Sequence, residues 1–120
     1  MKKIVLVDID GTISIVGDRL KYILQKPEDW DSFYNSCFED EPIQEIIDLV
    51  RVLENNYQIV YCTARSEKVR ALTKNWIEKY VYKNKKELSN DYLLMREVDD
   101  IRNDEDVKPY VLSKSKWKLE

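Results

Sequence analysis

The chain has 120 residues and a formal net charge of −3, and hydrophobic and charged residues make up 43% and 36% of it. This composition is typical of one small globular domain, and it argues against broad nucleic-acid binding while leaving room for a local basic cleft. The absence of histidine excludes Ser-His-Asp and Cys-His catalysis and histidine-ligated metals. The presence of only two glycines excludes Walker A loops and GxGxxG fingerprints.

In chain order, the first half of the sequence predicts one strand and two helices. Ile4–Val7 is a short apolar run without polar alternation, which is typical of a buried central strand in a parallel sheet. A loop is expected over 8–17. Apolar residues at helical spacing then follow Pro27, and they are Trp30, Phe33, Tyr34, Cys37 and Phe38. Pro42 is expected to open a second helix that continues to Leu53.

The second half predicts two further strands and two further helices. Tyr57–Cys62 is a β-rich run, and Ser66 is placed to cap the helix after it. A third strand is expected at Tyr92–Met95. The last helix is predicted to begin near Asp106, because Pro109 fits a helix only within its first turn.

This alternation of strands and helices predicts the α/β fold class, as a Rossmann-like three-layer sandwich with a parallel sheet. We expect one domain over 1–120 with a small, cap-like helical insertion at 14–40. Cys37 and Cys62 lie among apolar residues and are expected to be reduced core thiols. No apolar run reaches the ~18 residues of a membrane span. Asp8 interrupts the first apolar run too early for a secretory signal, so a cytoplasmic protein is expected.

The segment that carries chemical information is the Asp-Ile-Asp-Gly-Thr run from Asp8 to Thr12, directly after the first predicted strand. Ligands of open α/β sheets bind at the carboxyl ends of the strands. Asp8 and Asp10 are two residues apart and point to the same side of an extended segment, where Mg²⁺ is their natural partner. The structural alternative is a simple Asp-Gly turn after a strand.

This run resembles motif I of the haloacid-dehalogenase-like phosphatases, and Thr63 and Lys108 stand where that family has its motif II hydroxyl and its motif III lysine. The resemblance sharpens toward the 3′-phosphatase domain of phage-type polynucleotide kinases. The residues that carry this closer resemblance are Arg19, Thr63-Ala64-Arg65, Thr73 with Trp76, Met95-Arg96, and the run from Asp100 to Lys108.

The resemblance implies a two-step phosphoryl transfer that uses Mg²⁺. Asp8 would attack phosphorus and form an aspartyl-phosphate, while Asp10 would protonate the leaving oxygen and then activate water. Mg²⁺ would contact Asp8 and the carbonyl of Asp10. Lys108, as a catalytic residue, and Thr63 would hold the other phosphate oxygens.

The resemblance also implies a set of substrate-binding residues. Thr12 belongs to this set, and Arg19, Arg65 and Arg96 would line the mouth of the site and engage substrate phosphates. Asp104 would orient Lys108 or an arginine. The implied substrate is a 3′-phosphate at a nucleic-acid end. The alternatives are a small-nucleotide phosphatase with the same chemistry and a catalytically weak or incomplete phosphate-binding module.

Several of these residues also have structural alternatives. Thr63 could cap the helix that begins after Ser66, and Lys108 could be a solvated surface lysine. The three arginines could form surface ion pairs.

Two departures from the family pattern have consequences for the fold and for the metal. Ala64 replaces a glycine, so the backbone there must avoid positive φ. The family also follows its lysine helix with a strand that ends in acidic motif IV, and the residues after Lys108 suffice only for the helix. We therefore expect a three-stranded core with an exposed edge that invites self-association, and a metal site that Asp99 and Asp100 do not complete.

Overall fold

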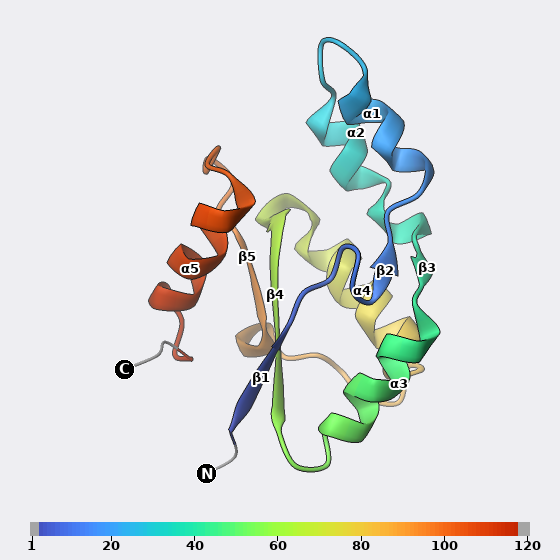
Figure 1. The fold of residues 1–120 in the computed structure, drawn as a ribbon, viewed down its shortest axis with the longest axis vertical. Coiled ribbons are helices and arrows are strands. Elements are labelled where there is room, and N and C mark those ends of the chain that lie inside the picture. Colours follow the sequence, from blue (N-terminus) through green and yellow to red (C-terminus); the bar gives the residue numbers. More distant parts are fainter. Residues whose placement is uncertain (1–2, 118–120) are drawn as a thin grey trace.

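The structure, a computed structural model that describes residues 3–117, is built on a three-stranded parallel sheet (Figure 1). The strands are β1 (Ile4–Val7), β4 (Gln58–Ser66) and β5 (Leu93–Arg96), in the order β1-β4-β5. The predicted α/β fold class with a parallel sheet is therefore confirmed. Strand β4 runs past the predicted end at Cys62, and β5 begins one residue later than predicted.

The prediction that the first strand is central and buried is wrong. Among the described residues, β1 pairs only with β4, so it forms an edge of the sheet. Val7 is buried, but Leu6 is 42% exposed because the helix on that face of the sheet packs against the other two strands. The exposed edge that we expected is thus present at β1, whereas self-association there remains a prediction.

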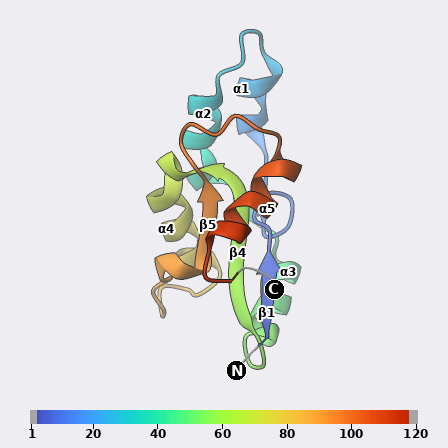
Figure 2. The same ribbon diagram turned by 90° about the vertical axis from the view of Figure 1, so that its left-hand side faces the viewer.

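Helices cover both faces of the sheet and complete the three layers (Figure 2). One face packs against α3 (Gln44–Leu53) and α4 (Arg70–Tyr80), and the other packs against α5 (Asp104–Lys114). Short 3₁₀ helices at Glu67–Val69 and Asn90–Tyr92 precede α4 and β5. None of the helices over the described residues is long and apolar enough to cross a membrane.

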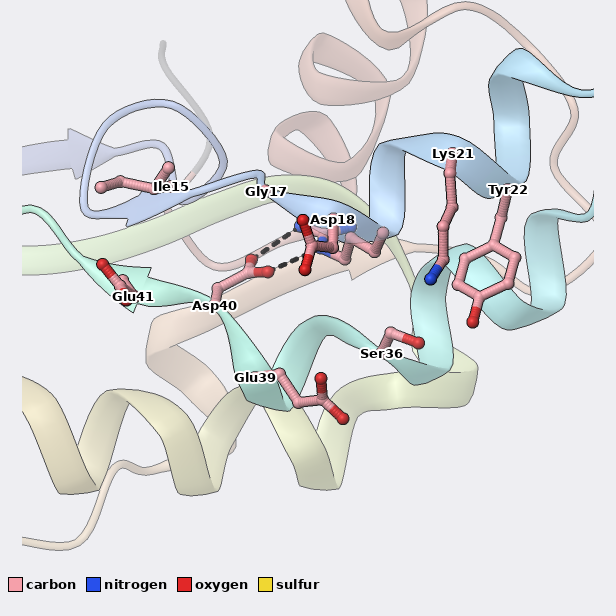
Figure 3. Close-up of a pocket in the computed structure, with 10 residues that line it drawn as sticks. Ile15, Gly17, Asp18, Lys21, Tyr22, Ser36, Glu39, Asp40 and Glu41 are labelled. Carbon is pink, nitrogen blue, oxygen red and sulfur yellow. Dashed lines mark hydrogen bonds and ion pairs between the residues drawn. The ribbon is translucent and has the colours of Figure 1, made fainter.

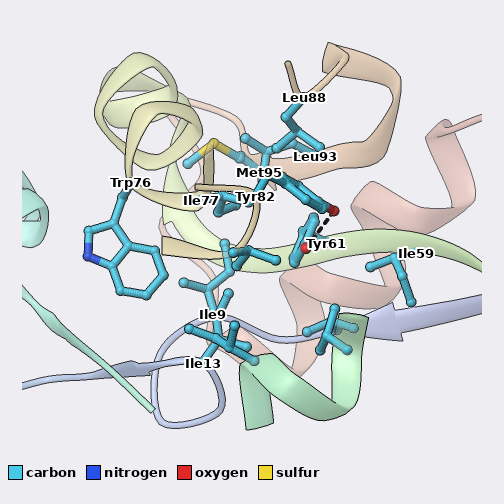
Figure 4. Close-up of a cluster of buried hydrophobic side chains, with 14 of the residues drawn as sticks. Ile9, Ile13, Ile59, Tyr61, Trp76, Ile77, Tyr82, Leu88, Leu93 and Met95 are labelled. Atoms are coloured by element: carbon cyan, nitrogen blue, oxygen red, sulfur yellow. Dashed lines mark hydrogen bonds between the residues drawn. The ribbon is translucent and has the colours of Figure 1, made fainter. Parts of the chain in front are cut away.

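The main core lies between the sheet and the α3–α4 layer (Figure 4). Ile9 and Ile13, from the turn after β1, are fully buried in it, as are Tyr61 of β4 and Ile77 of α4. The hydroxyl groups of Tyr61 and Tyr82 lie 2.9 Å apart and satisfy each other in this apolar surrounding. Burial raises the pKa of Tyr82 to about 12, so the pair stays neutral.

A helical insertion follows β1 and rises above the sheet (Figure 1). It is joined to the core by the antiparallel pair of β2 (Ser14–Ile15) and β3 (Glu41–Pro42). Between these strands lie two α-helices, α1 (Lys21–Leu24) and α2 (Trp30–Asn35). Two 3₁₀ helices lie there as well, at Asp18–Leu20 and Cys37–Glu39. The sequence predicted a loop over 8–17 and did not predict β2 or α1, because neither is long enough to show a periodic pattern.

Two helices begin later than their prolines suggested. Helix α2 starts at Trp30, where the Asp29 side chain caps it by accepting a hydrogen bond from the Ser32 amide at 3.0 Å. Pro27 therefore lies before the helix. Pro42 is part of β3 rather than the start of α3. In both cases a tertiary or capping contact outweighs the preference of proline for the first turn.

Helix α5 begins earlier than predicted, at Asp104, so Pro109 lies inside it rather than in its first turn. Asp104, Glu105 and Asp106 all occupy the first turn, where the helix dipole favours negative charge. This extra stabilisation at the N-terminus offsets the hydrogen bond that Pro109 cannot donate.

The two faces of α3 allow a direct test of this core. Ile47 is fully buried, whereas Leu49 on the same helix is 52% exposed. We expect Ile47→Ala to lower the free energy of unfolding by about 2–5 kcal/mol, because it leaves a cavity. Leu49→Ala should change it by no more than about 0.5 kcal/mol in the same urea titration. Equal effects of the two substitutions would contradict this packing.

Candidate active site

The candidate site lies at the carboxyl ends of β1 and β4. Val7, the last residue of β1, pairs in register with Tyr61 of β4. Asp8 therefore leaves β1 beside the stretch of β4 that contains Thr63, as expected for neighbouring parallel strands. The sequence thus placed the acidic segment and the motif II hydroxyl at one end of the sheet correctly.

Asp8 and Lys108 form the outer half of the site. The Lys108 Nζ, from α5, lies 3.0 Å from Asp8 Oδ2, and both side chains are about one-third exposed. The other carboxylate oxygen of Asp8 accepts a hydrogen bond from the Ile9 amide at 2.8 Å. Lys108 is therefore not a free surface lysine. The pair places a carboxylate and an ammonium group side by side where solvent and substrate can reach them.

A tight turn carries the chain from Asp8 back toward the insertion. Gly11 adopts φ of 81°, a left-handed conformation that strains residues with a Cβ atom. The amides of Thr12, Ile13 and Ser14 all donate hydrogen bonds to the Ile9 carbonyl, at 3.0–3.1 Å. Thr12 is thus a half-buried member of this turn. The turn fixes the direction in which Asp10 leaves the backbone.

Asp10 is held by two arginines. Its Oδ1 accepts hydrogen bonds from Arg65 Nη2 at 2.6 Å and from Arg19 Nη2 at 2.7 Å. The Arg65 Nε lies 3.2 Å from the same oxygen, and the Ser14 hydroxyl lies 3.3 Å from it. Two cations from distant parts of the chain therefore converge on one carboxylate.

Asp40 completes this charge cluster, and sequence reasoning missed it. Its carboxylate accepts hydrogen bonds from Arg19 at 2.8 Å and lies 3.3 Å from Arg65 Nη2, and its side chain is buried. The Trp76 indole donates a hydrogen bond to the Asp40 carbonyl at 2.9 Å. No sequence pattern separates Asp40 from its neighbours Glu39 and Glu41, because its role arises only from tertiary pairing. We call Asp10, Arg19, Asp40 and Arg65 the buried charge cluster.

The electrostatics of the cluster keep Asp10 ionised. Burial on its own would raise the pKa of Asp10, but the hydrogen bonds and positive charges of Arg65 and Arg19 hold that pKa below its ordinary value. Asp10 and Asp40 in turn raise the pKa of Arg19 against the effect of its burial. Two positive and two negative charges thus balance one another, and of the four side chains only Asp10 is partly exposed, at 29%.

Arg19 and Arg65 do not line an open mouth of the site, whereas Arg96 lines a cleft between α2 and the loop after β5. That these arginines engage substrate phosphates stays a prediction. Arg19 and Arg65 are buried in the charge cluster. Arg96 is also buried, and its guanidinium donates to the carbonyls of Ala64, Asp100 and Arg102. All three arginines are therefore committed to internal contacts. A sequence motif names such residues but does not show whether they face the substrate or the protein.

Two further predicted residues take definite positions. The Thr63 hydroxyl is buried and accepts a hydrogen bond from the Arg65 amide, while Ser66 provides the cap for the following helical turn by bonding the Lys68 amide. Asp104 lies 3.0 Å from Arg96 Nη2, so it pairs with an arginine, one of the two alternatives that we considered.

The residues that could hold a divalent metal are few. Among the described residues, no three carboxylate or thiol side chains come close enough together to hold a metal ion. The Asp100 carboxylate is occupied by Arg102 at 2.6 Å, which lowers the pKa of Asp100 to about 2. Of the two ligands that the resemblance implies, the Asp8 carboxylate is partly exposed at the end of β1, and the role of the Asp10 carbonyl stays a prediction. This small oxygen set suits Mg²⁺, which retains water and shares its shell with substrate phosphates.

A polar cavity of about 290 Å³ lies in the insertion, behind the charge cluster (Figure 3). Asp40, Lys21 and Tyr22 line it, whereas Asp8 and Asp10 do not. It is therefore separate from the acidic turn at the end of β1.

Comparison with known proteins identifies the family of this chain. The family described as "Polynucleotide kinase PNKP phosphatase domain" matches residues 2–115. A baculovirus protein, the "Putative bifunctional polynucleotide kinase/RNA ligase" of Autographa californica nuclear polyhedrosis virus, is 32% identical over 102 residues. That alignment covers 83% of this chain but only 13% of the viral protein.

Two solved structures share the fold. Chains from the Pnkp1/Rnl/Hen1 complex and the Pnkp1/Rnl/Hen1 RNA repair complex superpose with TM-scores of 0.71 and 0.73, at 21% and 20% sequence identity. Each superposition covers 99% of this chain and about a third of the other chain, at 36% and 34%.

The parallel sheet and the acidic turn at its carboxyl end define the class of protein as a haloacid-dehalogenase-like phosphatase domain. Within that class, the chain belongs to the polynucleotide kinase PNKP phosphatase domain family, whose match spans nearly all of it.

The lowered pKa of Asp10 makes stability depend on pH. The Asp10 pKa in the folded chain lies below 3.8, the ordinary value, so its ionisation stabilises the fold fully above that pH. The contribution is lost as the pH falls through the lowered pKa. We expect the free energy of unfolding of Asp10→Asn to fall less steeply below pH ~4 than that of the parent.

The measurement is urea unfolding over a series of acidic pH values. The matched control is Asp48→Asn, which alters an exposed carboxylate on α3 and should retain the slope of the parent. A slope in Asp10→Asn as steep as in the parent would show that Asp10 does not carry this dependence.

Proposed function

We propose that this phosphatase domain is a Mg²⁺-dependent phosphomonoesterase that forms an aspartyl-phosphate on Asp8 and removes 3′-phosphates from nucleic-acid ends. The observation that carries the proposal is the contact of Asp8 with Lys108 at 3.0 Å, beside an Asp10 held by two arginines. The similarity to the viral protein described as a "Putative bifunctional polynucleotide kinase/RNA ligase" supports a polynucleotide substrate.

In the proposed first step, a carboxylate oxygen of Asp8 attacks phosphorus, and the bond from phosphorus to the 3′ oxygen breaks. Lys108 neutralises charge on the phosphoryl oxygens as they pass through the transition state. The Asp8 carboxylate and the Asp10 carbonyl would hold a Mg²⁺ ion, which would supply further neutralisation of the phosphate. Thr63 lies three residues before the end of β4, and in this proposal its hydroxyl would meet a phosphoryl oxygen.

Asp10 moves the protons in both steps. It gives a proton to the departing 3′ oxygen and takes one from the water that hydrolyses the aspartyl-phosphate. The charge cluster holds the pKa of Asp10 low, so the carboxylate is ready to act as the base. The proton that it donates in the first step comes from solvent water, and the proton that it takes from the hydrolytic water in the second step replaces it. Arg19, Arg65 and Asp40 act as positioning residues, because they fix the orientation of Asp10 from behind.

Substitution of the nucleophile tests this proposal. Asp8→Asn should lower kcat by at least ~10³-fold, because an amide is a poor nucleophile and a weak Mg²⁺ ligand. Phosphate release from a 3′-phosphorylated oligonucleotide is the measurement, and Asp48→Asn is the matched control that should retain the activity of the parent. Activity of Asp8→Asn within about tenfold of the parent would overturn the assignment.

The same assay separates the alternative functions. Activity of the parent should require Mg²⁺ at millimolar levels, because one carboxylate side chain and one carbonyl form a weak site. A preference for 5′-phosphates or for free mononucleotides would favour the small-nucleotide phosphatase. Absence of phosphate release at any Mg²⁺ level would favour the incomplete phosphate-binding module.

A further inference from the structure

A second cavity, a cleft of about 700 Å³, lies between α2 of the insertion and the loop that joins β5 to α5. These two segments face each other above the carboxyl ends of the strands (Figures 1 and 2). Four of its lining side chains are aromatic or apolar, with Trp30 and Tyr34 on the α2 side and Val98 and Ile101 on the loop side, and the others are polar or charged. Trp30, Val98 and Ile101 are all exposed. Exposed apolar side chains gathered in a cleft offer a surface that a ligand can cover.

The cleft lies beside the active site. Arg96, which lines the cleft, donates a hydrogen bond to the carbonyl of Ala64, the neighbour of Thr63, at 2.8 Å. Asp104, which also lines it, precedes Lys108 on α5 by four residues, about one helical turn. Ser66, at the end of β4, lines the cleft as well. A molecule whose phosphate sits at Asp8 would therefore extend its next chemical group into this cleft.

The Trp30 side chain packs against two neighbouring aromatic rings of α2. Its ring meets the Phe33 ring edge-on, with centroids 5.5 Å apart, and lies at a tilt of 34° to the Tyr34 ring at 5.9 Å. These contacts hold the indole in place, yet Trp30 remains 46% exposed. A supported aromatic face of this kind can stack on a flat ligand ring at little cost in side-chain entropy.

The charges in the cleft do not suit a run of backbone phosphates. Three basic and four acidic residues line the cleft, and each basic residue is already in an ion pair. The pairs are Lys68 with Asp31 at 3.5 Å, Arg96 with Asp104 at 3.0 Å, and Arg102 with Asp100 at 2.6 Å. An extended phosphate backbone would thus gain no unpaired cation here and would meet a small excess of negative charge.

We infer that this cleft holds the nucleobase of the nucleotide that carries the reactive phosphate, with Trp30 as the stacking platform. The inference rests on the proposed function, and it names the group by which that site selects nucleic-acid ends. A base has a flat, uncharged face, so stacking tolerates any sequence and needs none of the paired cations. Trp30 is then a specificity-determining residue rather than a catalytic one.

The test compares two short oligonucleotides that carry the same 3′-phosphate and the same backbone. One has a normal terminal nucleotide, and the other has an abasic sugar at that position. We expect kcat/KM of the parent to be about tenfold lower for the abasic substrate. Trp30→Ala should lower only the value for the normal substrate, to the abasic level. Trp30→Phe, which retains a stacking ring, should keep most of the preference.

Phe38→Ala is the matched control, because Phe38 is an exposed aromatic residue of the same insertion that does not line the cleft. It should leave the preference for the base intact. Values of kcat/KM for the two substrates within about twofold of each other in the parent would overturn the inference, as would an equal loss on both substrates in Trp30→Ala.

Binding gives a reading that does not depend on turnover. A nucleoside 3′-monophosphate should quench the tryptophan fluorescence of the parent, and Trp30→Ala should abolish the quenching, whereas ribose 3-phosphate should leave the fluorescence unchanged. If no phosphate is released but this quenching is seen, the proposed function fails and the base site stands. If phosphate is released but the quenching is absent, the base site fails alone.

Salt dependence provides an independent check. Each backbone phosphate contact to a single strand would cost about threefold in affinity between 50 and 200 mM salt. We expect KM for the oligonucleotide to rise by no more than about threefold over this range, because only the reactive phosphate meets a cation. A rise of more than about tenfold would show that the backbone is bound along its length.

Discussion

The buried charge cluster is the interaction on which the rest of this structure depends. Asp10 comes from the turn after β1, Arg65 from β4, and Arg19 and Asp40 from the two ends of the helical insertion. Removal of one partner from such a network costs about 3–5 kcal/mol, because a buried charge is left without compensation. The same ion pairs therefore connect the insertion to the sheet and fix the orientation of Asp10. In a chain that contains no histidine, the cluster thus holds rigidly the carboxylate that we propose for proton transfer.

The position of Asp8 shows the complementary requirement. The nucleophile that we propose must stay accessible, and among the described residues Asp8 is anchored by one backbone amide and one partly exposed lysine. Lys108 reaches it because α5 packs across β4 and β5. The two aspartates thus differ in surroundings although they are two residues apart. Asp10 is fixed and screened by arginines, whereas Asp8 faces the solvent beside a single ammonium group.

The sequence predicted the parts of this protein that depend on local patterns. Ile4–Val7 and the following Asp8–Thr12 run identified the first strand and the acidic turn, because both the apolar run and the spacing of the carboxylates are local features. The sequence analysis expected Arg19 and Arg65 at the mouth of the site, whereas both are buried, and it did not identify Asp40 as their partner. Burial and ion pairing of these residues arise from segments more than twenty residues apart, which periodicity and motif spacing do not report.

The central claim is that the phosphoryl group passes through Asp8. An acyl phosphate on a carboxylate is reduced by borohydride, whereas a free carboxylate is not. The most direct measurement is therefore borohydride treatment of the chain quenched during turnover of a 3′-phosphorylated oligonucleotide with Mg²⁺, followed by mass spectrometry of the peptide that contains Asp8. The account predicts reduction at Asp8 that depends on substrate. Reduction at another carboxylate, or intact Asp8 in a chain that is releasing phosphate, would contradict it.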